Sequence, residues 1–272
     1  MPKAYVEPNV INWARRSNWT GVALRSRLEA RGLEPHFGIH GIYELARGFL
    51  SEQSKAVAQQ NFEILAELDP IFGPTPDILF AKELDRLRTR AAVIPVLDDL
   101  NRASAKQEVI QMAAGRLEAD GREFLQRRES GIDRDYPRYT AFQLSQTRAA
   151  VAAGTERPKT PEEAFAELDP QVPGIIRQIL GDRITASEAA ELHARLDEFP
   201  ALRSTVRANL YHWTIPLMHD AAGSRDKNDD YRHVIEASYV DVFVTGDNQL
   251  AHTVPRLHPG LQVLTWHELE AG

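Results

Sequence analysis

The sequence predicts an α/β protein in which a small parallel sheet is flanked by helices in three layers and carries a large all-helical insertion. Short apolar, β-prone segments occur near both ends of the chain, at residues 4–6 and 242–245. Strands that alternate with helices are typical of a parallel sheet covered by helices on its faces. Between residues 91 and 209, by contrast, the pattern is helical throughout.

The first part of the chain supplies two of the predicted strands. Residues 4–6 are apolar and are followed by an acid and a proline, which predicts a short first strand. Residues 10–31 have a helical pattern, and Gly32 is a typical stop. A second strand is predicted at residues 36–39, and it passes into a helix whose apolar face carries Ile42, Leu45, Ala46 and Phe49.

Helix start signals mark the middle of the chain. Ser104, Thr160 and Thr185 each begin a capping pattern with an acidic or amide side chain three residues on. Pro200 is expected to end or bend the helix that follows Thr185.

The last part of the chain returns to alternating elements. A helix is predicted from residue 229 to about residue 239, opened by Asn228 or Asp226. The continuous apolar run at residues 242–245 is typical of a buried parallel strand. A turn then leads into a short helix, and residues 261–264 form a last strand before the C-terminal helix.

These patterns divide the 272 residues into three parts. Residues 1–90 and 210–272 are expected to form the two halves of the α/β domain, and residues 91–209 the helical lobe. Cysteine is absent, which excludes disulfides, thiolate catalysis and cysteine-ligated metal sites. The N-terminus lacks a secretory pattern and no apolar run approaches the ~18 residues of a membrane span, so a cytoplasmic protein without a membrane partner is expected.

Charge is unevenly distributed along the chain. The formal net charge is −7, which disfavours a nucleic-acid partner, but residues 1–50 carry +3. Arg15, Arg16 and Arg47 lie in this segment and are candidates for phosphate contact. An ordinary solvated, arginine-rich helix also explains the charge, and charge alone favours that explanation over a phosphate-binding face.

Two acids occupy equivalent positions at opposite ends of the chain. Glu7 follows the first predicted strand, and Asp247 follows the strand at residues 242–245 by one glycine. Ligands of open α/β sheets bind outside the carboxyl ends of the strands. If the two strands are neighbours, the two carboxylates lie side by side, and such a pair needs a cation. Oxygen ligands without cysteine suit Mg²⁺ or Mn²⁺.

Three further acids are less clearly placed. Asp230 shares a helix face with Val234, which must pack on the sheet, whereas Asp229 suits the helix N-terminus as a partner of the helix dipole. Glu44 points away from the apolar face of its helix. It is either a solvated partner of Arg47 or part of a polar face that lines a groove, and periodicity does not distinguish the two.

Three motifs together resemble the PIN-like nuclease family. The stretch DYRHVIEASYVDVFVTGD, from Asp230 to Asp247, is similar to the family's C-terminal signature, in which an acid opens a helix and a short strand ends in Thr-x-Asp. YVEPNVI at residues 5–11 is similar to its first strand, and IYELARG at residues 42–48 to its second motif. The resemblance covers roughly residues 3–50 and 226–268.

The resemblance implies a PIN-like fold and a metal-dependent phosphodiesterase that acts on RNA, with single-stranded DNA as a second candidate. It implies that Mg²⁺ or Mn²⁺ is held by four acids, with Asp229 as an additional ligand: Glu7, Glu44, Asp230 and Asp247. Asn9, Thr245 and His233 would orient ligands or water. A toxin or phage-defence endoribonuclease is the expected setting, with an inhibitory protein partner and a homodimer as further expectations.

Alternatives remain beside this interpretation. The family's first acid is usually Asp, and Glu7 lengthens it by one methylene, which favours a catalytically weak module that binds nucleic acid or a protein partner. A phosphatase of the haloacid dehalogenase type would need two Asp residues where this chain has Glu7 and Asn9. His36 and His40 are expected to be structural, and Trp13 and Trp19 to pack into a core rather than stack on bases.

Overall fold

The computed structural model describes residues 1–221 and 224–271, and its centre is a parallel sheet. Among these residues the sheet has five strands in the order β3-β2-β1-β4-β5. The strands are β1 (Lys3–Val6), β2 (Glu34–Gly38), β3 (Ile71–Gly73), β4 (Val242–Thr245) and β5 (Gln262–Thr265). Every neighbouring pair is parallel. The predicted α/β class, with a small parallel sheet flanked by helices, is confirmed.

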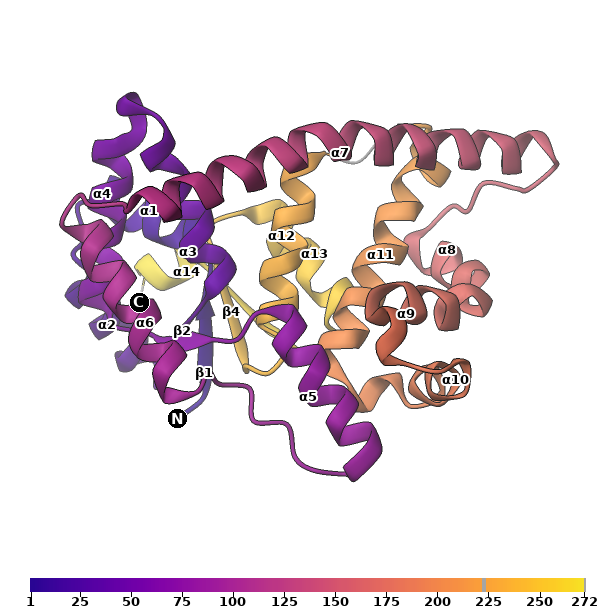
Figure 1. The fold of residues 1–272 in the computed structure, drawn as a ribbon, viewed down its shortest axis with the longest axis horizontal. Helices are drawn as coiled ribbons and strands as arrows, with labels where there is room; N and C mark the ends of the chain where they lie inside the picture. Colours follow the sequence, from indigo (N-terminus) through magenta and orange to yellow (C-terminus); the bar gives the residue numbers. More distant parts are fainter. Residues whose placement is uncertain (222–223, 272) are drawn as a thin grey trace.

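The helices fall into three successive groups along the chain (Figure 1). The first group is α1 (Pro8–Arg16), α2 (Gly21–Ala30), α3 (Ile39–Ala46), the 3-10 helix Arg47–Leu50, α4 (Glu52–Leu68) and α5 (Pro76–Thr89). The second is α6 (Asp99–Ala113), α7 (Ala119–Ala152), α8 (Pro161–Leu168), α9 (Val172–Leu180), α10 (Ala186–Ala194) and α11 (Pro200–His219). The third is α12 (Arg225–Glu236), α13 (Asn248–Leu257) and α14 (Trp266–Ala271).

Alternate side chains of the central strands face two different helix layers. Val6 and Val244 pack into a core with α1, α2, α4 and α6. Tyr5 and Phe243 point to the other side, where their rings stack at 5.5 Å and pack with α12 and α13. This alternation is the ordinary period of a strand, and it gives the sheet one helix layer on each face.

A second apolar core lies in the helical lobe. It joins side chains of α5 to those of α9, α10 and α11, and Ile235 of α12 also belongs to it. Figure 1 shows the long helix α7 running from the sheet side of the molecule to the far end of the lobe. The division at residues 91 and 209 stays a prediction, and the packing crosses it, because α5 lies before residue 91 and α6 packs with the sheet.

Local backbone conformation changes two of the predicted elements. The helix expected over residues 10–31 is two helices, because Asn18 adopts φ 56° and Thr20 caps a new helix by accepting the Ala23 N–H at 3.1 Å. The strand β3 was not predicted. It is three residues long, which is too short for a period-2 pattern to stand out.

Capping signals in the middle of the chain are borne out at two of three places. Thr160 caps α8, and Thr185 forms a capping box with Glu188. Ser104, however, lies inside α6, which begins earlier because Asp98 accepts the N–H of Asn101 at 2.9 Å. The expectation for Pro200 was wrong: it occupies the first turn of α11, where a missing N–H costs nothing.

The strand order places a topological switch point between β1 and β4. The chain adds β2 and β3 on one side of β1, then returns to add β4 and β5 on the other. Val6 pairs with Val244, so the two strands end at the same level. A crevice at the carboxyl ends of such strands is the usual ligand site of an open α/β sheet.

Candidate active site

Glu7 and Thr245 are neighbours at the carboxyl ends of β1 and β4. The Glu7 N–H donates to the Val244 carbonyl at 3.0 Å, which extends the strand pairing by one residue. The Thr245 hydroxyl donates to Glu7 Oε2 at 3.1 Å and accepts the Asp247 N–H at 3.0 Å. The Thr245 hydroxyl therefore holds both the Glu7 carboxyl and the backbone of Asp247 in place.

The Glu7 carboxyl is buried, with 3% of the residue exposed. Burial raises its pKa to about 8, and the nearby Glu44 carboxylate adds to this. The positive charge of His233 and hydrogen bonds from the Asn9 N–H and Thr245 act in the opposite direction. At neutral pH the Glu7 carboxyl is therefore mostly protonated. A cation bound beside it would favour the ionised form.

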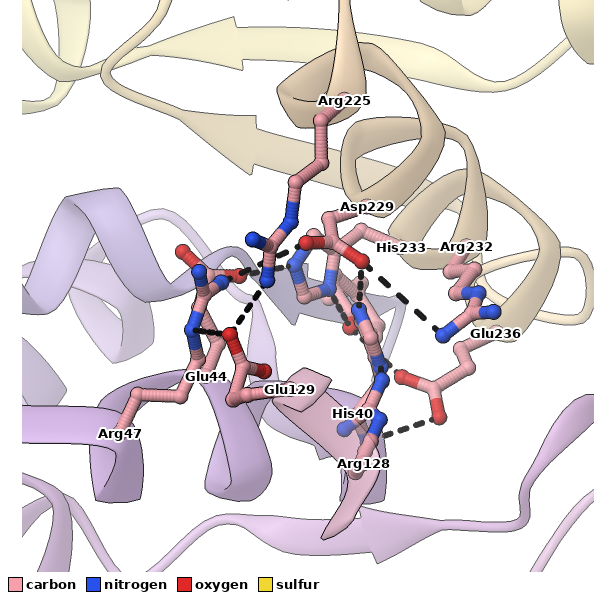
Figure 2. A network of polar contacts seen from close by, with 11 residues as sticks. His40, Glu44, Arg47, Arg128, Glu129, Arg225, Asp229, Arg232, His233 and Glu236 are labelled. Atoms are coloured by element: carbon pink, nitrogen blue, oxygen red, sulfur yellow. Dashed lines mark hydrogen bonds and ion pairs between the residues drawn. The ribbon is translucent and has the colours of Figure 1, made fainter. Parts of the chain in front are cut away.

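The polar faces of α3 and α12 meet (Figure 2), and the Glu7 carboxyl is close enough to feel the charges of Glu44 and His233. His40 and Glu44 are four residues apart on α3, so they share one face of that helix. His233 Nε2 lies 2.7 Å from Glu44 Oε2, and His40 Nε2 lies 3.3 Å from Asp229 Oδ1. Glu44 points away from the apolar face of α3 because it faces α12, and its pairing with Arg47 is not needed to explain its position.

A hydrogen-bond chain continues from His233 to the other side of α12. The Tyr5 hydroxyl donates to Glu236 Oε2 at 3.0 Å, so it accepts a hydrogen bond from His233 Nδ1 at 2.8 Å. Glu236 Oε1 accepts the His40 backbone N–H at 3.0 Å. These contacts place a proton on Nδ1 of His233 and direct its Nε2 at Glu44.

His233 and Glu44 form an ion pair in which the imidazole is buried and the carboxylate is 31% exposed. Burial would lower the pKa of His233, but its bond to Glu44 and the surrounding carboxylates outweigh burial and raise the pKa to about 9. For Glu44 burial would raise the pKa, and the bond to His233 reverses this and lowers it. The imidazolium supplies positive charge between the acids, in the place where a metal ion would supply it.

Arginines surround this cluster and alternate with acids. Arg47 contacts Glu129 at 3.1 Å and Asp229 at 3.4 Å, and Arg225 pairs with the same Glu129. Burial would raise the pKa of Asp229, but hydrogen bonding to His40 and the charges of Arg232 and Arg47 hold it at about 2. Figure 2 shows these side chains converging from α3, α7 and α12. We call these arginines, Arg47, Arg225 and Arg232, the rim of the cluster. Guanidinium groups of this kind bind anionic groups such as phosphates.

The cluster includes donor atoms with the spacing of a metal site. One ligand atom each from His40, Glu44 and His233 lies within 4.8 Å of the others, a grouping found among the described residues. His233 fits this role, because a metal-bound imidazole usually donates its other N–H to a fixed acceptor, here Tyr5. His40 fits less well, since Arg128 donates to its Nδ1 at 2.9 Å and leaves the proton on Nε2. Imidazole with carboxylate favours Mn²⁺ over Mg²⁺.

The two remaining predicted acids, Asp247 and Asp230, are not in the group of possible metal ligands that His40, Glu44 and His233 form among the described residues. Asp247 Oδ1 accepts the N–H groups of Gln249 and Leu250 at 2.6 and 3.0 Å and so caps α13, which leaves Oδ2 for a ligand role. Asp230 is half-buried and, one residue beyond Asp229, is turned about 100° around α12 from it. For both residues a metal-binding role stays a prediction.

The other predicted contacts lie mostly on α1. Asn9 lies beside Gly246, where a Cβ would come within 3.2 Å of Asn9 Oδ1. Arg15 donates to Asn61 at 3.1 Å, and Arg16 lies over the Trp13 ring at 5.7 Å. Of the three predicted phosphate-contacting arginines, Arg47 is the one that forms ion pairs with this cluster among the described residues, to Glu129 and Asp229. Both predicted core tryptophans pack against Trp266, as expected.

Sequence reasoning missed seven residues of the network: Tyr5, His40, Arg128, Glu129, Arg225, Arg232 and Glu236. One available signal was the spacing of His40 and Glu44, which is a full helical turn. The equivalent spacing of Asp229, His233 and Glu236 on α12 was a second. Two polar stripes of this kind predict an interface only when the helices are known to be neighbours.

Fold and site together define a parallel α/β protein with an acid and histidine cluster at its switch point. Comparisons with protein-family models, with curated proteins and with solved structures find no match to the chain. None of the helices in the described part of the chain combines the length and the apolar character that crossing a membrane requires.

Proposed function

We propose that the chain is a PIN-like, divalent-metal-dependent nuclease that cleaves single-stranded nucleic acid, with RNA as the first candidate substrate. The observation that carries this proposal is the position of Glu7, Glu44 and His233 at the switch point between β1 and β4. The buried Glu7 carboxyl is near enough to the partly exposed Glu44 carboxylate to feel its charge, and a cation would stabilise both. The arginines of the rim suit a phosphodiester.

Each group in the cluster has a specific part in this proposal. Glu7, Glu44 and His233 would hold the ion, joined by Asp247 Oδ2 and Asp230. The ion, when bound, would lower the pKa of a bound water and polarise the scissile phosphate. Tyr5 and Glu236 keep the proton of His233 on Nδ1, and Thr245 keeps Glu7 directed at the cluster. Arg47 and Arg232 would attract the substrate's phosphates.

One observation favours a second candidate, a catalytically weak module that binds nucleic acid or a protein partner. His233 already neutralises Glu44 within the protein, and Glu7 is longer than the Asp of the family it resembles. Both features would allow a stable cluster without a metal. The toxin or phage-defence setting belongs to the first candidate.

Cleavage of labelled single-stranded RNA and DNA with Mn²⁺ tests the proposal. Glu7→Gln keeps the size and the uncharged state of the buried side chain but removes a ligand, so we expect cleavage to fall at least about 100-fold. Asp230→Asn tests the proposed metal-binding role of Asp230 in the same assay. Glu156→Gln, at an exposed position between α7 and α8, is the control and should cleave like wild type.

Two outcomes would decide against nuclease activity. Equal cleavage by wild type and Glu7→Gln would mean that the activity arises elsewhere or from a contaminant. Retained nucleic-acid binding without any cleavage by wild type, across Mg²⁺ and Mn²⁺, would support the binding module instead.

A further inference from the structure

A cavity of about 610 Å³ lies between the helical lobe and the candidate active site. Its walls come from α3, α5, α7, α9, α11 and α12. His40 and Glu236 belong both to this cavity and to the cluster beside Glu7. Its volume is within the range of small-molecule sites, and its position gives it direct access to the reacting centre.

The wall contains buried polar groups that have no partner among the described residues. His212 of α11 is 5% exposed, and neither of its ring nitrogens has a hydrogen-bond partner. The Tyr231 hydroxyl of α12 is in the same state, and the two rings meet edge to face at 6.1 Å. Leaving such groups unpaired costs about 1–3 kcal/mol each. None of these atoms is exposed to the cavity, so a ligand would pair with them only after a side-chain rotation.

Flat rings and cationic groups occur together in the same wall. The Tyr139 ring stacks on His212 at 5.7 Å and 11°, and Gln143 fixes its hydroxyl with a bond of 2.9 Å. Arg128 lies over the Tyr43 ring at 5.2 Å, at the end of the cavity that adjoins His40. Stacking surfaces beside a guanidinium are the means by which proteins hold unpaired bases and their phosphates.

Charge in the cavity is also consistent with an anionic, planar ligand. The wall contains two arginines, Arg128 and Arg232, and two acids, Asp77 and Glu236. Glu236 is occupied by the Tyr5 hydroxyl and the His40 N–H. Its bonds are directed at the sheet and α3, so the charges available to a ligand are the two guanidinium groups and the Asp77 carboxylate.

We propose that this cavity binds one unstacked nucleotide of a single-stranded nucleic acid, with the base against the Tyr139 ring, which His212 supports from behind, and the phosphate at Arg128. The inference rests on the proposed nuclease function and specifies its substrate: a strand from which a base can be turned out. It also gives the helical lobe a role, because α7 and α11 supply the rings. A base paired in a duplex cannot enter the cavity.

Calorimetric binding of adenosine 5′-monophosphate and of a seven-nucleotide single-stranded RNA, in EDTA, tests the cavity without catalysis. Arg128→Gln removes the guanidinium, and we expect at least about tenfold weaker binding of both probes. Arg127→Gln is the matched control, since Arg127 is the adjacent, exposed residue of α7 and should bind like wild type. Tyr139→Ala tests the stacking surface independently, with a loss of about tenfold.

The outcomes separate this inference from the proposed nuclease. Binding by wild type and Glu7→Gln without cleavage would keep the cavity and remove the nuclease. Cleavage by wild type with equal RNA affinity in Arg128→Gln, Tyr139→Ala and Arg127→Gln would remove the cavity and keep the nuclease. Equal affinity for a blunt RNA duplex would also overturn the single-strand assignment. Thermal unfolding of each variant confirms that a loss of binding is not a loss of fold.

Discussion

At the scale of single residues, Gly38 leaves room for the hydrogen-bond chain behind the cluster. A Cβ at this position would lie 1.8 Å from Glu236 Oε2 and 2.5 Å from the Tyr5 hydroxyl. Its backbone, with φ −84° and ψ 152°, is open to any residue, so the requirement is for space alone. Gly38→Ala must displace Glu236 or Tyr5, and we expect the free energy of unfolding to fall by about 1–3 kcal/mol.

Urea denaturation measures this effect, and Gly131→Ala is its control. Gly131 is in α7, and nothing lies within 4 Å of a Cβ there. Alanine is the better helix former, so the control should be unchanged or more stable by up to about 1 kcal/mol. If the two variants had equal stability, Gly38 would not be packed as the structure describes.

The residues of the candidate site show which positions a sequence can predict and which it cannot. Glu7 and Asp247 were predictable because a parallel sheet brings strand ends to one edge. His40 was not, because its partners Asp229 and Arg128 lie about 90 to 190 residues away along the chain. Local spacing identifies which side chains share a helix face, but only the tertiary arrangement identifies what that face contacts.

At the scale of helices and strands, the length of an element and the clarity of its apolar pattern decided whether it could be predicted. The strand at residues 242–245 was predicted with its observed bounds, because three consecutive apolar residues followed by the β-branched Thr245 form a clear pattern. The three-residue strand β3 has one fully buried side chain, Phe72, and no periodicity to detect. The break at Asn18 depends on a single left-handed residue, which periodicity over residues 10–31 averages away.

The N-terminus of α11 is capped from another helix, which no local pattern could indicate. Glu83 of α5 is fully buried and accepts the N–H groups of Ala201 and Leu202 at 2.7 and 2.8 Å. Tyr239 donates to the same carboxylate at 2.6 Å. Burial raises the pKa of Glu83 to about 7, and these three hydrogen bonds offset part of that rise.

This raised pKa predicts how stability depends on pH. The folded chain binds the Glu83 proton more tightly than the unfolded chain, whose glutamates titrate near about 4.3. The stability that the protonated Glu83 contributes is fully present below about pH 4.3 and is lost as the pH rises through about 7. Glu83→Gln stays uncharged throughout, so its stability should decline less steeply between pH 5 and 7, by up to about 1.4 kcal/mol per pH unit.

Urea unfolding of wild type and variant at three pH values provides the comparison. Glu156→Gln, an exposed position, should follow wild type in parallel. Indistinguishable pH slopes for Glu83→Gln and wild type would contradict the buried position of this carboxyl. The difference between the two proteins is the quantity to use, because other buried acids contribute equally to both.

At the scale of the whole molecule, the lobe and the sheet share helices rather than a linker. Helix α5 precedes the predicted lobe boundary yet contributes to the lobe's core, and α12 places Ile235 there and Val234 in the core beside the sheet. The cavity proposed to bind a nucleotide lies between the same parts. Binding and stability are therefore expected to depend on both parts together.

This shared packing predicts that residues 91–209 do not fold alone. The fragment lacks the four apolar side chains that α5 places in the lobe core, Leu79, Phe80, Leu84 and Leu87. Their burial is worth on the order of 6–12 kcal/mol in total, which is comparable with the entire stability of a domain. Calorimetry should give one cooperative transition for the full chain and none for the fragment. Two separate transitions in the full chain, or cooperative melting of the fragment, would show that the lobe is an independent domain.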